Sequence, residues 1–176
     1  KYGLPVSQKK ESQDICFIPN NNYRDFISRM SYSPSREGPI IDLQGKKVGV
    51  HKGLEFYTIG QRKGLGLAFS EPVYVVDIIP ERNTIKIGPA EALYSKGLEL
   101  EDVNYITSPV TDATKIEVKI RYRSPLHKAI LYPVCSKSDH ALIEFDEPQK
   151  AVTPGQSAVF YKGDQVLGGG VIKKPL

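Results

Sequence analysis

The stretch Lys115-Ile116-Glu117-Val118-Lys119-Ile120-Arg121-Tyr122-Arg123 decides the fold class, because apolar and charged side chains alternate strictly along it. Successive side chains of a β-strand point to opposite faces, so this period of two predicts a strand with one buried face. The buried face is expected to carry Ile116, Val118, Ile120 and Tyr122. The other face is expected to present a cationic row formed by Lys119, Arg121 and Arg123.

Short strand candidates continue this texture from Pro72 to the end of the chain. They are residues 73–79, 84–88, 97–106, 128–135, 141–145, 157–161 and 165–172, and turns rich in Gly and Pro separate them. Many short strands without a long helix are typical of a small closed β-barrel. The sequence therefore predicts a six- to seven-stranded antiparallel barrel over residues 72–176.

The chain before Pro72 has a different pattern. Apolar residues recur at helical spacing over residues 23–30, directly after three asparagines that can cap a helix. Residues 39–43 and 46–51 flank Gln44-Gly45, which predicts a β-hairpin. We expect a small α+β domain over residues 18–71 and a mainly β protein as a whole. Residues 1–17 carry no clear period and are interpreted as a linker.

The composition is that of a folded soluble protein. The 176 residues are 40% hydrophobic and 25% charged, with two cysteines and a formal net charge of +4. The N-terminus has no signal-peptide core, and no apolar run approaches the roughly 18 residues of a membrane span. We therefore expect a cytoplasmic protein without a membrane partner. The charge excess is +5 in residues 1–70 and −1 in residues 71–176, which favours a phosphate-bearing partner for the first part or for a local stripe in the second.

Cys16 is the first candidate for chemistry. Two lysines precede it, and nearby cations favour the reactive thiolate, whereas an acidic neighbour and an apolar pocket oppose it. Its neighbours Ile15 and Phe17 also fit a buried strand cysteine with no chemical role. Residue type alone favours the structural interpretation, and Cys135 has the same one.

The segment Gly60-Gln61-Arg62-Lys63-Gly64-Leu65-Gly66 combines three glycines with two adjacent cations. Glycines let backbone N–H groups approach an anion closely, which suits phosphate contact. The spacing of a nucleotide P-loop is not present, and a solvated surface turn explains the segment about as well. The three histidines have no ligand spacing, so no metal site is predicted.

Four segments become specific when they are taken together. They are SQDICFI at 12–18, YTIGQRKGLG at 57–66, KIRYR at 119–123, and 145–161, which begins FDEP and continues AVTPGQSAVFY from Ala151. The closing LGGGVI at 167–172 also fits. In this order they resemble the tRNA-specific 2-thiouridylase family, MnmA/TrmU, over about Ser12 to Ile172.

The resemblance implies an N-terminal ATP-pyrophosphatase domain, a small central tRNA-binding domain and a C-terminal β-barrel. Residues 1–17 then correspond to the end of the first domain and carry the catalytic Cys16. Residues 18–71 and 72–176 correspond to the other two domains. ATP with Mg is expected to bind to the N-terminal domain, whose ATP-binding loop and partner-cysteine motif this sequence does not contain. The chain alone is therefore expected to hold no cofactor and to be inactive.

The implied reaction is 2-thiolation of the wobble uridine of tRNA. ATP adenylates the oxygen at carbon 2, and the cysteine matching Cys16 delivers sulfur to that carbon from a persulfide. The partner cysteine then resolves the intermediate, because releasing sulfur from a persulfide requires a second thiolate or a reductant. An iron–sulfur cluster in place of the persulfide stays open for the full-length protein.

The same resemblance implies the residues that contact tRNA. Arg121, Tyr122 and Gln156 are assigned to tRNA, and Arg62 and Lys63 to its backbone. The expected partners are the anticodon stem-loop of tRNA and a sulfur-donor protein, and the expected state is a monomer. The target base lies in a loop, so extruding it costs little.

Two other functions compete with this one. The first is a non-catalytic RNA-binding β-barrel module in which Cys16 is structural. The second is a protein-interaction barrel with no nucleic-acid role.

Overall fold

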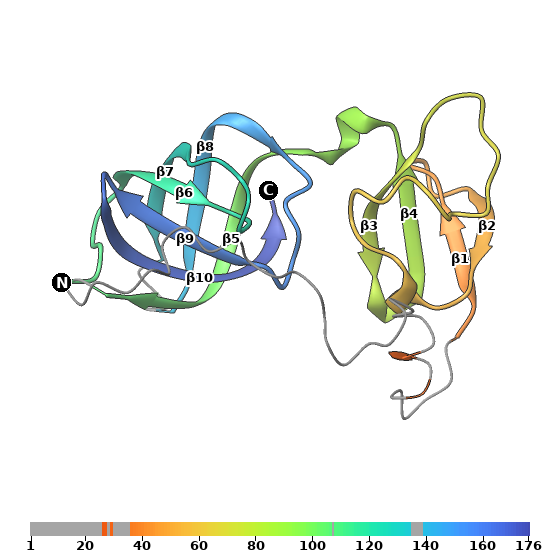
Figure 1. The fold of residues 1–176 in the computed structure, drawn as a ribbon, viewed down its shortest axis with the longest axis horizontal. Coiled ribbons are helices and arrows are strands. Elements are labelled where there is room, and N and C mark those ends of the chain that lie inside the picture. The colour runs from red at the N-terminus through yellow and green to blue at the C-terminus, as the bar shows by residue number, and fades with distance from the viewer. Residues whose placement is uncertain (1–25, 28, 30–35, 107, 135–138) are drawn as a thin grey trace, which may run out of the picture.

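The computed structural model describes residues 26, 27, 29, 36–106, 108–134 and 139–176. Two β-structures follow one another along the chain, a four-stranded sheet and a closed barrel (Figure 1). The protein is mainly β, as the sequence predicted. Of the helix expected over residues 23–30, the described residues Phe26, Ile27 and Arg29 are helical. No helix in the described ranges has the length and apolar character needed to cross a bilayer.

The first sheet contains β1 (Gly38–Ile41), β2 (Lys47–His51), β3 (Tyr74–Ile79) and β4 (Thr84–Gly88), in the order β2-β1-β4-β3. β1 and β2 form the predicted antiparallel hairpin. The Asp42 carboxylate accepts the N–H groups of Gln44 and Lys46 at 3.0 and 2.8 Å. Gly45 supplies the positive φ of 84° that this turn requires.

The boundary predicted between residues 71 and 72 differs from the observed sheet. β3 and β4 form a hairpin as expected, but β4 pairs in parallel with β1 instead of joining the barrel. Ile85 and Ile87 of β4 share one apolar core with Ile40 and Val75. The first domain therefore extends to β4, and the short 3-10 turn η4 (Ala90–Leu93) leads from it to the barrel.

Six strands form the barrel, each antiparallel to its neighbours. They are β5 (Tyr94–Tyr105), β6 (Thr114–Lys119), β7 (His127–Pro133), β8 (Ala141–Lys150), β9 (Ser157–Lys162) and β10 (Gln165–Pro175), closed in the order β10-β5-β8-β7-β6-β9. The predicted barrel is confirmed. Its interior is one cluster of buried side chains to which every strand contributes.

The alternation that predicted β6 holds only in part. Ile116, Val118 and Ile120 are buried in the barrel. β6 ends at Lys119, however, and Ser124 turns the chain by donating its N–H and its hydroxyl to the carbonyl of Arg121 at 3.1 and 3.0 Å. Tyr122, expected on the buried face, is 69% exposed. The expected cationic row is therefore broken after Lys119.

The barrel closes where β10 passes between β5 and β9 at Gly168-Gly169-Gly170. A Cβ on Gly168 would fall on the carbonyl oxygen of Asn104 and 3.0 Å from the ring of Phe160. Phe160 is fully buried, so its ring occupies the space that a side chain at Gly168 would need. Close packing of this kind leaves no room for an extra methyl group.

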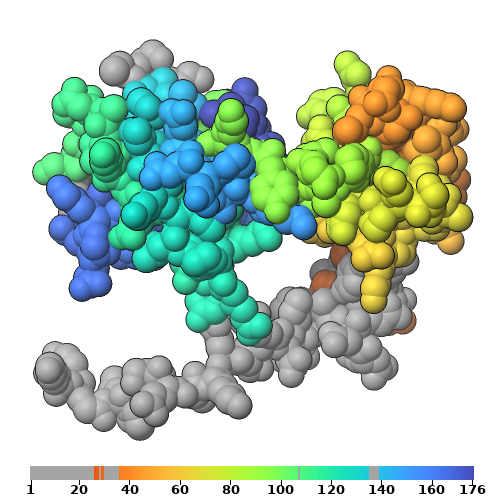
Figure 2. All heavy atoms as spheres, turned by 90° about the horizontal axis from the view of Figure 1, so that it is seen from above, coloured from red at the N-terminus to blue at the C-terminus, as the bar shows by residue number. Residues whose placement is uncertain are grey.

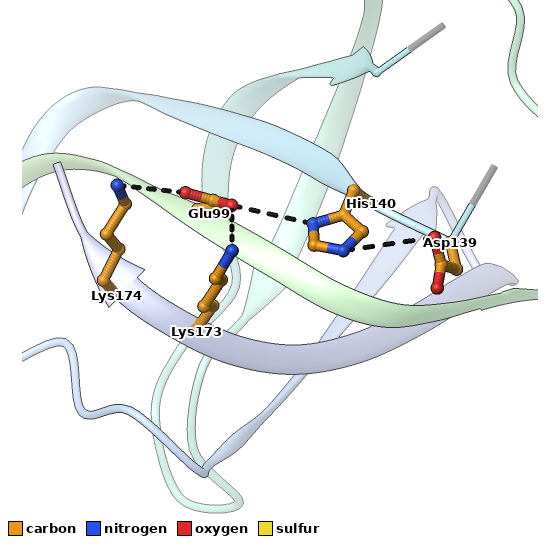
Figure 3. Close-up of polar contacts among 5 residues, drawn as sticks. All are labelled: Glu99, Asp139, His140, Lys173 and Lys174. Atoms are coloured by element: carbon orange, nitrogen blue, oxygen red, sulfur yellow. Dashed lines mark hydrogen bonds and ion pairs between the residues drawn. The ribbon is translucent and has the colours of Figure 1, made fainter. Parts of the chain in front are cut away.

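Ion pairs on the outer wall reinforce the same closure (Figure 3). The carboxylate of Glu99 in β5 forms ion pairs with two lysines of β10. Its oxygens lie 2.8 Å from Lys173 Nζ and 3.2 Å from Lys174 Nζ. His140, just before β8, lies 3.6 Å from Glu99 and 4.0 Å from Asp139. Hydrogen bonds from Lys173 and then Lys174 lower the pKa of Glu99 to about 2.

The ordinary pKa of a glutamate is 4.5, so the stabilisation from Glu99 is complete above that pH. It is lost as the pH falls from about 4.5 toward 2, because the proton that Glu99 then binds weakens both lysine contacts. We expect Glu99→Gln to make the free energy of unfolding less dependent on pH in this window. The free energies of unfolding of variant and wild type should converge as the pH approaches 2. Urea unfolding at several pH values measures this. Lys173→Met should reduce the same dependence, and an unchanged slope in both variants would contradict the assignment.

Gly168→Ala should destabilise the barrel by about 1–3 kcal/mol, because Cβ would overpack a site bounded by backbone and a buried ring. Chemical unfolding followed by circular dichroism measures the change. Gln165→Ala, at the exposed start of the same strand, is the matched control and should alter stability by less than about 0.5 kcal/mol.

Candidate nucleic-acid interface

Three loops carry the residues that the sequence assigned to nucleic acid. They are the Gly60–Gly66 loop of the first domain, the turn 121–124 after β6, and the turn 151–156 between β8 and β9. We call the junction between the first domain and the barrel, where Gly60 and Tyr74 lie against Ala151 and Lys150, the seam. Figure 2 shows the two bodies touching there, with the green residues of the connection bridging them.

The Gly60–Gly66 loop is anchored to β3 and braced by Gln61. Gly60 N–H donates to the carbonyl of Val75 at 2.8 Å, and Val75 N–H donates to the carbonyl of Gln61 at 2.9 Å. The Gln61 side chain accepts the N–H of Thr58 and donates to the carbonyl of Lys63, both at 3.0 Å. Arg62 and Lys63 thus sit on a fixed backbone with exposed side chains. That arrangement suits contact with an anion.

The turn after β6 presents Arg121 and Tyr122 to solvent. Both are exposed, and Lys119 Nζ lies 5.7 Å from the centre of the Tyr122 ring, a cation–π contact. A phenol ring beside a lysine offers a stacking surface for a base and a positive charge for a phosphate. Proteins that bind unpaired nucleotides combine these two features. Arg121 also reaches across to the next loop, because its Nη2 donates to the carbonyl of Ala151.

The turn 151–156 is fixed at both ends. Thr153 donates its hydroxyl to the Ala151 carbonyl at 2.9 Å, so that oxygen accepts two side-chain donors. At the other end, Ile172 of β10 donates its N–H to the carbonyl of Gln156 at 2.8 Å. The side chain of Gln156 is exposed.

Ala151 lies at the seam itself. A Cβ built on Gly60 would lie only 3.5 Å from the Cβ of Ala151. Hence Arg121, Ala151 and Gly60 form one continuous path from the barrel turn to the loop that carries Arg62 and Lys63. The structure thus brings Arg121 of the barrel and the start of the Gly60–Gly66 loop to the same residue, Ala151.

The cations of these loops differ from those of the barrel wall. Within residues 36–106, 108–134 and 139–176, the carboxylate ion pairs form around Glu99 and Asp139, and Arg62, Lys63 and Arg121 take part in none of them. Burial lowers the pKa of His127, near the turn after β6, so its ring stays neutral near pH 7. The positive charge at the seam comes from the arginines and lysines.

Two assignments lie outside this surface. Cys16, the predicted sulfur carrier, lies outside the described residues, as does Cys135. Among the described residues, no group of three or more His, Cys, Asp or Glu is placed to hold a metal ion.

Sequence reasoning missed three residues at the seam. Ala151 has a left-handed φ of 54° and is buried, and the chain pattern gave no sign of either. Lys150 Nζ lies 5.5 Å from the centre of the Tyr74 ring, although 76 positions separate the two residues. The short AVTPGQ motif was the only available signal, and it marked a turn without indicating what the turn touches.

Comparison with known proteins divides the chain as the sheets do. A family model described as "tRNA methyl transferase PRC-barrel domain" matches residues 24–89, and one described as "Aminomethyltransferase beta-barrel domain" matches residues 95–172. The division between them falls at the connection from β4 to β5. It therefore agrees with the observed first domain and barrel.

Curated relatives match nearly the whole chain. Proteins named tRNA-specific 2-thiouridylase MnmA from Moorella thermoacetica and Halothermothrix orenii are 47% and 46% identical to it over 174 residues, which is 98% of this chain. The relative of the same name from Carboxydothermus hydrogenoformans is 43% identical over 177 residues. In each case the chain spans 48% of the relative's length. The two domain matches and these relatives together show that the chain belongs to the tRNA-specific 2-thiouridylase MnmA family.

Proposed function

We propose that this chain is the tRNA-recognising part of a tRNA 2-thiouridylase and that it carries, at Cys16, the thiol that delivers sulfur to the wobble uridine. The observation that supports this most is that Arg121 of the barrel and the glycine loop of the first domain, which carries Arg62 and Lys63, both approach Ala151. The names of the relatives supply the reaction class. The anticodon stem-loop is the proposed ligand, because its unpaired bases can be stacked and its target base extruded at little cost.

In this proposal the residues at the seam bind and orient the RNA. Arg62 and Lys63 neutralise backbone phosphates from a braced glycine loop, and Arg121 offers the part of its guanidinium that Ala151 does not use. Tyr122 gives an exposed ring for an unpaired base, and Gln156 gives an amide that can donate and accept hydrogen bonds.

The proposed sulfur transfer balances with two thiols. Adenylation turns the oxygen on carbon 2 of uridine into a leaving group. The terminal sulfur of the Cys16 persulfide attacks carbon 2, and AMP departs with the oxygen. A second cysteine thiolate then attacks the Cys16 sulfur, which leaves a disulfide on the protein and the sulfur on the base. A thiol reductant must reduce that disulfide before the next turnover.

ATP and Mg have no proposed site on the described residues. We assign adenylation to the part of the relatives' length that this chain does not match. The reaction is accordingly proposed for the full-length protein, and we expect the chain alone not to complete it.

RNA binding by the chain should depend strongly on salt. Each neutralised phosphate contributes about −0.7 to −0.9 to the slope of log K against log salt concentration. Arg62→Gln and Lys63→Gln should each weaken binding of an anticodon stem-loop RNA and reduce that slope by about one contact. Lys162→Gln, at the far end of β9, removes the same charge and should leave binding nearly unchanged. Fluorescence anisotropy across a salt series measures this, and binding by the wild type that is absent or insensitive to salt would count against the proposal.

The role of Cys16 is tested in the full-length protein. Cys16→Ser should abolish 2-thiouridine at the wobble position, whereas Cys135→Ser should retain it, because only the first thiol is assigned to sulfur transfer. Mass spectrometry of nucleosides from tRNA of cells carrying each variant measures the modification. Unchanged thiolation in Cys16→Ser would favour the alternative, a non-catalytic RNA-binding barrel with a structural cysteine.

A further inference from the structure

The proposed RNA surface is built from two domains, so its geometry depends on how the domains are held together. Arg62 and Lys63 belong to the first domain, and Arg121, Tyr122 and Gln156 belong to the barrel. Binding of a single RNA strand to both groups costs less ordering entropy if their separation is already fixed. The contacts between the domains at the seam therefore affect RNA binding by positioning the residues that contact RNA.

Lys150 makes a contact that spans the seam. It is the last residue of β8 and pairs with Tyr94 at the start of β5. Its Nζ lies 5.5 Å from the ring centre of Tyr74, the first residue of β3 in the other domain. A cation over a phenol ring is attracted by the negative face of the ring.

The neighbouring Ala151 turns the chain into the seam. Its N–H donates to the carbonyl of Leu93 at 2.7 Å, which ties it to the connection between the domains. Its side chain is 6% exposed and lies against Gly60. Its carbonyl accepts Arg121, so the same short corner joins the connection, the first domain and a proposed RNA contact.

We propose that Lys150 and Tyr74 are positioning residues that clamp the barrel on the first domain and thereby hold Arg121 and the Gly60–Gly66 loop on one RNA-binding surface. This inference rests on the proposed function for its RNA readout. Lys150 acts through the Tyr74 ring and makes no phosphate contact of its own.

The first test separates positioning from phosphate contact. Lys150→Met and Tyr74→Leu should each weaken binding of an anticodon stem-loop RNA by about threefold to fivefold. The double variant should be no weaker than either single variant, because the two side chains act as a pair. Tyr74→Phe keeps the ring and should retain wild-type affinity. Lys162→Met is the control for loss of a lysine from the barrel.

The salt series decides the mode of action. A positioning lysine leaves the slope of log K against log salt unchanged, whereas loss of a phosphate contact reduces its magnitude by about 0.7 to 0.9. A reduced slope in Lys150→Met, or wild-type binding in Tyr74→Leu, would overturn the clamp.

A second readout does not depend on RNA. Hydrogen exchange of the Ala151 amide, which donates to Leu93, should become faster in Lys150→Met and Tyr74→Leu but not in Tyr74→Phe or Lys162→Met. Unchanged exchange in the first two variants would refute the clamp. If the wild type binds no RNA while the exchange changes as expected, the proposed function fails and the clamp stands.

Discussion

The barrel depends on how closely β10 can approach β5 and β9. The Gly168-Gly169-Gly170 run meets backbone oxygens of β5 and β9 and the ring of Phe160 at distances that leave no space for side chains. Closure at this point lets Phe160 fill the interior and removes the exposed sheet edges that would otherwise remain. It also fixes the C-terminal end of the turn 151–156, because Ile172 of β10 accepts the N–H of Gly155 and donates its own N–H to the carbonyl of Gln156.

The closed barrel also fixes the position of the seam, through the hydrogen bonds of the Ala151 backbone. Both polar groups of this peptide position are satisfied, the N–H by Leu93 and the carbonyl by Arg121 and Thr153. Buried backbone groups are costly when left without partners, so these bonds determine where the corner can lie. The first domain then rests against a defined surface.

The fold was largely accessible from local sequence patterns, and the failures have physical causes. Period-two alternation and turn residues located the hairpins and most barrel strands, because each depends on neighbours along the chain. Alternation could not reveal that β6 ends before Arg121. The hydrogen bond from Ser124 to Arg121 turns the backbone there, while the apolar and charged residues still alternate in the sequence. Nor could it assign β3 and β4 to the first domain, because the parallel pairing of Ile40 with Ile85 is a long-range contact.

In the candidate site, too, some residues could be assigned from the sequence and others only from the folded chain. Arg62, Lys63, Arg121, Tyr122 and Gln156 were assigned to nucleic acid through motifs, and all five are exposed in the structure. Lys150 and Tyr74 carry no motif and are far apart in sequence, so only the folded chain reveals their contact. Residues that position a surface are harder to predict than residues that form it, because their partners are set by tertiary packing.

Arg121 joins the two roles through the shape of its side chain. A guanidinium carries five N–H donors in one plane, and the Ala151 carbonyl takes a donor from Nη2 only. The hydrogen bond fixes the orientation of the plane while the exposed donors stay available to a phosphate. A lysine at this position would concentrate its charge in one ammonium group, which would have to serve both the Ala151 carbonyl and the proposed RNA ligand. The guanidinium therefore allows one residue to hold the Ala151 corner in place and still present a fixed fork of donors to the RNA backbone that we propose as its ligand.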